Sequence, residues 1–485
     1  MKNRTRKAER GQAIVLLVFA LVGLLAFTGL AIDGGMLYSD RRSAQNAADS
    51  GALAGGYSLA SNNYSGVVPT ALAQAGVNGF GGPASGPHVT TNSGFLHDAV
   101  YDDGNTRTEV YWPPADGPYQ GNIKYVQVKV THTIKTNFIH LVWPGLARST
   151  VQAVARADPS GPVGLGKSLV GLSPHDCNTV WFNGNGACPP DNPGCTNKDT
   201  ILVEITDGGG VYSNSDATGN CASGQQNGSG GIYVDSGSID VVGSFRQVGN
   251  SGTVYPNPNT GVDRLNIPSV PIPDCLTGYP NLSSVPGGNT VTINPGRYDQ
   301  IRQTGNNDVL NLNPGVYCIQ HDFVINGGTI QVNPSANSDQ GVFIYMMNLG
   351  GNDVFSIGGG TIVNLRAAQD TNNPLMFPAK DPVTDEPMGE VNYNGLLLLY
   401  NPKTPPTTSV QVTVSGNPIV NRGTPYTGSI IAPTVGCNIA GTSDVETIDA
   451  EIICYVVNVS GDALLQMRYD AGKLFDLAGR LNLVK

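Results

Sequence analysis

Charged residues are scarce in this sequence, and the scarcity excludes one class of partner. Only 13% of the 485 residues are Asp, Glu, Lys or Arg, about half of the share usual in soluble proteins. The 27 basic residues are outnumbered by 37 acidic ones, so the net charge is −10. Because nucleic-acid binding depends on clustered Lys and Arg that neutralise phosphates, we expect no nucleic-acid partner.

Motifs for catalysis are also lacking. The sequence contains no G-x-S-x-G elbow, no P-loop and no zincin helix, and its six histidines are scattered. A polysaccharide-active β protein would need paired carboxylates. The candidates do not recur in one frame, and we interpret them as solvated turn residues: Asp299, Asp308, Asp322 and Asp353, with Arg297, Arg302 and His321 nearby. We therefore expect a non-enzyme without catalytic residues, cofactor or metal.

Charge is missing altogether from residues 13–32, which contain a single hydroxyl at Thr28. A helix of twenty residues is about 30 Å long, the thickness of the hydrocarbon core of a bilayer. The alternative is a cleaved signal peptide, whose apolar region is shorter and ends in an A-x-A-like site. Here Asp33-Gly34-Gly35 follows the apolar run, so the pattern predicts a retained transmembrane helix.

The flanks of this span predict its orientation. Lys and Arg at positions 2, 4, 6, 7 and 10 precede it, whereas Asp33 and Asp40 follow it before the next basic residues. Positive charge stays on the cytoplasmic side of membranes. We therefore expect a single-pass protein with residues 1–12 as a cytoplasmic tail and the bulk of the chain extracytoplasmic.

Residues 33–60 keep a helical pattern beyond the span, which predicts a helical stalk. One stripe of this helix consists mainly of small residues that allow close approach of another backbone. The stripe could pack on the chain's own domain or on a partner helix, and the pattern leaves both open. Its members are Leu37, Ala44, Ala48, Gly51 and Gly55.

Four short strings in this region resemble one known family. They are GQA at 11–13, GLAID at 29–33, QNAAD at 45–49 and ALA at 52–54, and together they resemble the TadE/TadG-like family. The resemblance implies a membrane-anchored, pilin-like accessory protein of the bacterial Tad (Flp) pilus assembly system. Processed members carry Glu five residues after the cleavage Gly, where this chain has Leu16. The resemblance thus points to the unprocessed TadG branch, in the bacterial cytoplasmic membrane.

Cysteines lie only beyond the span, and none forms a C-x-x-C pair. An even number of cysteines in an exported chain favours disulfides. Local bridges among Cys177, Cys188 and Cys195 would staple a Pro/Asn/Gly-rich loop, and a metal site with nearby His175 is the alternative. The candidate disulfide cysteines are Cys177, Cys188, Cys195, Cys221, Cys275, Cys318, Cys437 and Cys454.

The rest of the chain is rich in Gly (63) and Pro (33) and reads as short strands and turns. Residues 123–134 and 150–157 alternate with period two and predict strands, with a loop or short helix at 136–145. They belong to a region, 61–157, that resembles the small extracytoplasmic part of the same family. Residues 158–199 are interpreted as a Cys/Pro/Gly-rich linker.

Between residues 200 and 470 short apolar runs recur every 10–20 residues. The string VTINPGRY at 291–298 returns as LNLNPGVY at 310–317. This cadence predicts a β-solenoid, a right-handed parallel β-helix; a sandwich of antiparallel strands is the alternative. Residues 471–485 are expected to cap it. The fold class is therefore mainly β, with an N-terminal transmembrane and stalk helix, a small β unit and a large β-solenoid.

These observations favour a non-catalytic, pilin-like assembly component of a Tad pilus system. Its expected partners are other Tad pilus or secretion membrane proteins, or pilin-like proteins, bound through the N-terminal helix. The β-domain would offer a surface for polysaccharide or other surface contacts. The alternatives are a membrane-tethered adhesin or stalk and a polysaccharide-active β-helix protein.

Overall fold

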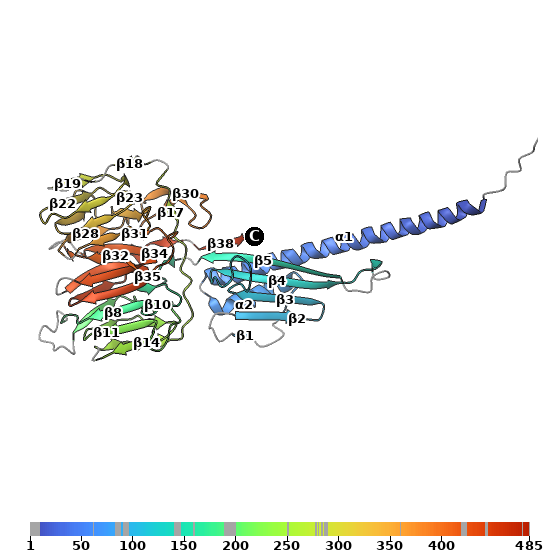
Figure 1. Cartoon of the computed structure of the whole chain (residues 1–485), viewed down its shortest axis with the longest axis horizontal. Helices are drawn as coiled ribbons and strands as arrows, with labels where there is room; N and C mark the ends of the chain where they lie inside the picture. The colour runs from blue at the N-terminus through green and yellow to red at the C-terminus, as the bar shows by residue number, and fades with distance from the viewer. Residues whose placement is uncertain are drawn as a thin grey trace, which may run out of the picture. The chain divides into compact units, whose positions relative to one another are not determined.

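The chain folds into two compact units, Met1–Pro159 with Gly479–Lys485 (unit 1) and Ser160–Ala478 (unit 2). It is mainly β with a long apolar N-terminal helix, as expected (Figure 1). The computed structural model describes residues 10–61, 63–82, 89–90, 97–139, 147–158, 161–188, 200–249, 252–276, 279, 281–282, 285, 290–358, 360–418, 424–441, 445–477 and 479–484.

Unit 1 begins with α1 (Arg10–Ala60), one helix of 51 residues. Its sequence contains no Pro and is rich in Ala and Leu, which favour helix. The predicted span and the predicted stalk are therefore one uninterrupted helix. The 3-10 turn η1 (Tyr64–Gly66) and the second helix α2 (Val67–Val77) follow it.

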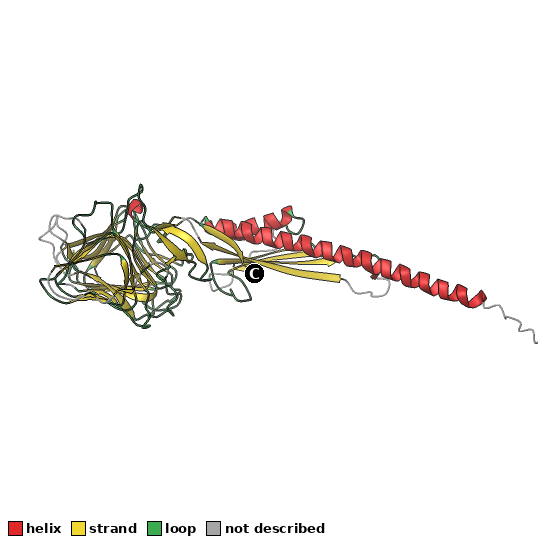
Figure 2. Ribbon diagram, turned by 90° about the horizontal axis from the view of Figure 1, so that it is seen from above, coloured by secondary structure: helices red, strands yellow, loops and turns green. Residues whose placement is uncertain are grey.

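The sheet of unit 1 is antiparallel and has six strands in the order β1-β2-β3-β4-β5-β38. Both strands predicted for this region are confirmed, as β4 and β5. Figure 2 shows the strands along one side of α1, and Ala side chains of α1 pack on Val side chains of β4 and β5 there. The bounds are β1 Val89–Thr90, β2 His97–Asp102, β3 Thr106–Trp112, β4 Tyr125–Ile134, β5 Ala147–Asp158 and β38 Arg480–Val484.

The last strand corrects the expectation of a cap at residues 471–485. β38 pairs antiparallel with β5 in unit 1, with Arg480 opposite Asp158. Leu481 packs against the core of unit 1, so the alternating apolar residues of this segment complete a sheet. Before it, β37 (Asp476–Leu477) pairs with β6 (Gly161–Pro162) inside unit 2. Unit 2 is thus inserted between two neighbouring strands of unit 1.

Unit 2 is built on a sheet of 27 strands. Its strands pair in parallel, commonly with the strand three places along the chain. One row of pairings runs β18 (Asn281–Leu282), β20 (Gly296–Tyr298), β23 (Gly315–Ile319), β26 (Val342–Met346), β31 (Leu396–Tyr400), β34 (Tyr426–Gly441), β35 (Val445–Gly461), β7 (Leu169–Gly171), β10 (Val211–Ser213), β13 (Ile239–Val241), β16 (Asn259–Thr260).

Two further sets of strands run beside this row. The second row is β21 (Ile301–Gln303), β24 (Phe323–Ile325), β27 (Phe355–Ile357), β32 (Val410–Ser415), β34, β35, β8 (Val180–Gly184), β11 (Gly224–Asn227), β14 (Phe245–Val248). The third set has two parts: β19 (Thr290–Ile293), β22 (Val309–Leu312), β25 (Thr329–Val332), β28 (Ile362–Arg366), β33 (Asn417–Pro418); and β35, β36 (Leu464–Arg468), β9 (Ile201–Thr206), β12 (Gly231–Val234), β15 (Val254–Tyr255).

The first strands of unit 2 lie in the middle of this array. β7 and β8 pair with β35, near the C-terminal end of the unit's sequence. The region 158–199 is therefore not a linker as expected, because its segments at 169–171 and 180–184 complete the sheet. From β16 the chain crosses to the opposite end at β18, and on the way β17 (Ile272–Pro273) joins β29 (Met376–Lys380) and β30 (Pro387–Asn392) in a small sheet.

A buried carboxyl lies where the two ends of unit 2 meet. The backbone N–H of Gly164 donates to Glu451 Oε2 over 3.0 Å, and the Ser429 hydroxyl donates to Oε1 over 2.5 Å. The Phe475 N–H in turn donates to the Ser429 oxygen at 2.9 Å. Glu451 is fully buried, and burial raises its pKa to about 7. The incoming and outgoing segments are thus joined through one carboxyl.

The repeat seen in the sequence corresponds to neighbouring turns of the chain. β19 pairs with β22, and β20 pairs with β23, in register. The Asn residues of the two N-P-G strings and Asn333 of the next turn form a ladder, since Asn313 Nδ2 donates to Asn294 Oδ1 and Asn333 Nδ2 donates to Asn313 Oδ1, each over 2.6 Å. Such side-chain ladders stabilise stacked parallel strands.

Replacing the middle Asn of this ladder tests its contribution. We expect Asn313→Ala to lower the free energy of unfolding of unit 2 by about 1–2 kcal/mol, because two amide hydrogen bonds are lost at once. Urea unfolding of the full chain measures the loss. Asn372→Ala is the control, since this exposed side chain makes no hydrogen bond among the described residues. Equal stability of the two variants would contradict the ladder's role.

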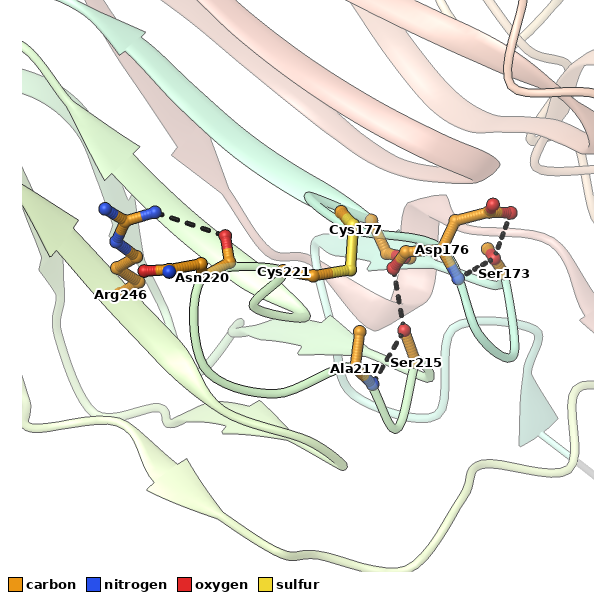
Figure 3. The surroundings of a disulfide bond; sticks show 9 residues. Ser173, Asp176, Cys177, Ser215, Ala217, Asn220, Cys221 and Arg246 are labelled. Atoms are coloured by element: carbon orange, nitrogen blue, oxygen red, sulfur yellow. Dashed lines mark hydrogen bonds between the residues drawn. A yellow bond between two sulfur atoms is a disulfide. The ribbon is translucent and has the colours of Figure 1, made fainter.

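Disulfides cross-link unit 2, confirming the prediction of disulfides for six cysteines. The bridges are Cys177–Cys221, Cys275–Cys318 and Cys437–Cys454. Figure 3 shows the first, between the β7–β8 and β10–β11 connections, where Ser215 Oγ donates to the Asp176 carbonyl at 2.7 Å. The expected local bridge from Cys177 is wrong, because its partner lies 44 residues away. Cys188 is also disulfide-bonded, and Cys195 lies outside the described residues.

Candidate functional site

The first half of α1 exposes an apolar surface. Side chains from Ile14 to Ile32 are almost all exposed, with Leu16 at 70% and Phe27 at 76%. Among the described residues of this span, Gly29 alone is buried. By length and composition α1 meets the requirements of a membrane-crossing helix.

Asp33, directly after this apolar stretch, holds the connection that leaves β4. Its carboxylate accepts hydrogen bonds from three consecutive backbone N–H groups, those of Asn137 (2.9 Å), Phe138 (2.8 Å) and Ile139 (2.5 Å). The side chain is fully buried. Hydrogen bonds to an ionised acceptor are the stronger kind, and successive N–H groups form a concavity suited to an anion. We call this contact the Asp33 latch.

Gly29 makes room for the same connection one turn earlier on the helix. A Cβ atom at this position would lie 2.8 Å from Phe138 Cγ and 2.9 Å from Phe138 Cβ. These are the inner atoms of the side chain, so the ring cannot simply rotate away, and the backbone around Phe138 is held by Asp33. A glycine is therefore required at this close approach.

Further contacts continue along the same face of α1. Asn137 Nδ2 lies 3.3 Å from Met36 Sδ, and His132 Nδ1 lies 2.8 Å from Asp40 Oδ1. Positions 29, 33, 36 and 40 follow each other at spacings of three and four, which places them on one side of a helix. The sequence reasoning missed this polar face. A lone Asp at the end of an apolar run was the available signal.

The small-residue stripe has contacts within the chain itself. Ala44, Ala48, Gly51 and Gly55 are buried, and Leu37 is half-buried. A Cβ on Gly51 would lie 3.0 Å from the Ala71 carbonyl oxygen, and one on Gly55 would lie 3.0 Å from that of Val67, both in α2. The close approach that the stripe predicts is thus made by α2 and by the sheet of unit 1.

In unit 2 the structure gathers several polar residues that the sequence left scattered. His321 Nε2 lies 3.8 Å from Asp299 Oδ1, and its Nδ1 lies 3.4 Å from Asp353 Oδ1. Arg302 and Asp322 form an ion pair beside them. Three turn regions supply these residues. Among the described residues, no group of His, Cys, Asp or Glu has an arrangement suited to a metal ion.

A protein-family model matches residues 11–62 of the chain. It is the Tad model, described as putative Flp pilus-assembly TadE/G-like. The resemblance of the N-terminal region to this family is thereby confirmed. No curated protein and no solved structure matches the chain. The TadE/G-like segment ends close to the end of α1 and includes Gly29, Asp33 and the small-residue stripe, whereas the Asn137–Ile139 side of the latch lies beyond it.

Proposed function

We propose that this chain is a membrane-anchored, non-catalytic, pilin-like component of a bacterial Tad (Flp) pilus assembly system. The observation that carries the proposal is the coincidence of the TadE/G-like segment, residues 11–62, with the exposed apolar half of α1 and the small-residue half that follows. The anchor is retained, since Leu16 stands where a processed prepilin has Glu. Partners are other Tad membrane or pilin-like proteins.

In this proposal α1 crosses the cytoplasmic membrane once, with its basic N-terminus inside. Units 1 and 2 then lie outside. Three disulfides in unit 2 support an extracytoplasmic location for this unit, because disulfides persist in oxidising compartments and are rare in the cytosol. We further infer that unit 2 is a right-handed parallel β-helix, which the three sets of parallel pairings support.

The topology can be tested with tags at the two ends of the full chain. Protease added to intact spheroplasts is expected to remove a C-terminal tag and to leave an N-terminal tag protected, because the lipid bilayer shields only the cytoplasmic end. Lysed cells, in which both tags are digested, are the control. A C-terminal tag that survives in intact spheroplasts would contradict the orientation.

The assignment to the Tad system needs a separate experiment. Deletion of the gene should abolish surface pili, and the tagged full chain should co-purify with Tad membrane proteins after crosslinking. The matched control exchanges residues 13–28 for an unrelated apolar span of equal length and keeps Gly29 to Asp33, so anchoring is retained while partner-specific contacts are lost. Normal piliation without co-purifying Tad proteins would refute the assignment and favour a tethered adhesin.

One observation favours a second candidate, a polysaccharide-active unit 2. His321 stands between two carboxylates, those of Asp299 and Asp353, and is 41% exposed. Paired carboxylates are what glycoside cleavage requires. Release of reducing ends from cell-surface polysaccharide by the wild type, and its loss in Asp353→Asn, would support this candidate. Equal, background release by both proteins would reject it.

A further inference from the structure

Exposed basic side chains gather where unit 1 meets the end of the apolar span. Lys135 follows the last residue of β4, and Arg148 lies opposite Thr133 in the strand pairing. Arg41 and Arg42 are next to Asp40, which contacts His132 on β4. All four cations are exposed, and none of them forms an ion pair within the part of the chain that the structure describes.

The two acids next to this surface, Asp33 and Asp40, offset only part of the charge of the four cations. The carboxylate of Asp33 is buried under three N–H groups, and that of Asp40 contacts His132. Side chains on a helix tilt toward its N-terminus, a tendency that brings the side chains of Arg41 and Arg42 closer to the apolar span. A chain of net charge −10 therefore presents a local positive surface at this end.

Phe138 extends the apolar surface beside the same cations. Its ring lies against Gly29, three residues before the end of the span at Ile32, and remains 45% exposed. Three residues of helix correspond to about 4.5 Å. An exposed aromatic ring at this depth is in the position where aromatic residues anchor proteins at membrane interfaces. The Asp33 latch fixes the backbone that carries the ring.

We propose that Phe138 with Lys135, Arg148, Arg41 and Arg42 forms a docking surface for a bilayer containing anionic phospholipids. The ring enters the boundary between acyl chains and headgroups, and the cations contact lipid phosphates. Continuity with the apolar span and complementary charge commit the surface to lipid. The inference rests on the proposed function only in placing residues 13–32 in a membrane, and it holds for either orientation. It would keep unit 1 against the membrane surface.

Photocrosslinking of the full chain in nanodiscs tests the docking surface. The nanodiscs contain phosphatidylcholine with a minor share of phosphatidylglycerol. Three single variants carry the probe: Phe138→benzoylphenylalanine, Phe27→benzoylphenylalanine as the control in the span, and Tyr57→benzoylphenylalanine at an exposed site near the other end of α1. We expect lipid adducts at positions 27 and 138 and none at 57, read by mass spectrometry.

The lipid identity of the adducts tests the charge. At position 138 phosphatidylglycerol should exceed its share of the bilayer by at least about fivefold. The combined change of Arg41, Arg42, Lys135 and Arg148 to Gln should return it to that share. Adducts at 27 without adducts at 138, or adducts at 138 without headgroup preference, would overturn the docking surface and leave the anchor standing. Absence of adducts at 27 would instead refute the proposed membrane anchor, and the docking surface with it.

Discussion

Replacing Glu451 by Gln should remove a pH-dependent loss of stability from unit 2. Burial raises the pKa of this carboxyl to about 7 in the folded chain, against 4.5 when it is exposed. Below pH 4.5 both states hold the proton, so the wild type is not penalised. As the pH rises toward 7, the unfolded state ionises first and the folded state loses stability. Above pH 7 the loss is complete, at about 3 kcal/mol.

The Gln side chain can occupy the same site without charge. Its oxygen can accept from the Gly164 N–H, and its amide can donate to the Ser429 hydroxyl, which acts as donor or acceptor. We therefore expect Glu451→Gln to exceed the wild type by about 3 kcal/mol at pH 8 and to match it near pH 4. Urea unfolding of the full chain across this pH range measures the difference. Glu390→Gln, at an exposed strand position, is the control; parallel profiles for wild type and Glu451→Gln would disprove the prediction.

Asp33→Ala should release the connection after β4 from α1. Three charge-assisted hydrogen bonds are lost together, so we expect the free energy of local opening at residues 137–139 to fall by about 3 kcal/mol. Hydrogen exchange at the amides of Asn137, Phe138 and Ile139 should accelerate about 100-fold, measured by mass spectrometry on the full chain in nanodiscs.

Two further variants separate the latch from general effects on the helix. Asp49→Ala removes a carboxylate whose described hydrogen bond is to Gln45 on the same helix, so exchange at 137–139 should not change. Asp33→Asn keeps one acceptor oxygen and should give an intermediate rate. Unaltered exchange in Asp33→Ala would show that the three hydrogen bonds do not hold this connection.

Local patterns in the sequence were sufficient to predict the long N-terminal helix, strands β4 and β5 of unit 1 and the repeated short strands of unit 2. The uncharged run of residues 13–32, the alternation of residues 123–134 and the repeated N-P-G string each mark structure formed by near neighbours. The strands at 169–171 and 180–184 escaped prediction because they pair with β35, at the other end of the unit's sequence. These segments are short apolar strings, LVG and VWFNG, and a string of three to five residues carries no sign of so distant a partner.

The sequence did not predict the Asp33 latch, although the strings that resemble the TadE/TadG-like family contain Gly29 and Asp33. The strings that include Gly29 and Asp33 lie within one helix, whereas the atoms they contact belong to a connection about 100 residues later, and no periodicity reports such a contact. The cluster at His321 was missed for another reason. Residues of one site would recur at a fixed spacing only if every turn had the same length. The turns that supply Asp299, His321 and Asp353 are separated by connections of unequal length, so these residues meet in space without a regular spacing in the sequence.

The insertion of unit 2 through its middle has a consequence for how this architecture can vary. The chain passes from unit 1 into unit 2 before β6 and returns after β37, and these two segments adjoin β7 and β35 in the middle of the array rather than either of its ends. Turns could therefore be gained or lost at either end of the array, by duplication or deletion in the gene, without changing the two connecting segments. The segment between β16 and β18 connects the two ends of the array, so it would have to lengthen or shorten with the number of turns. Its length should therefore correlate with the number of turns among relatives.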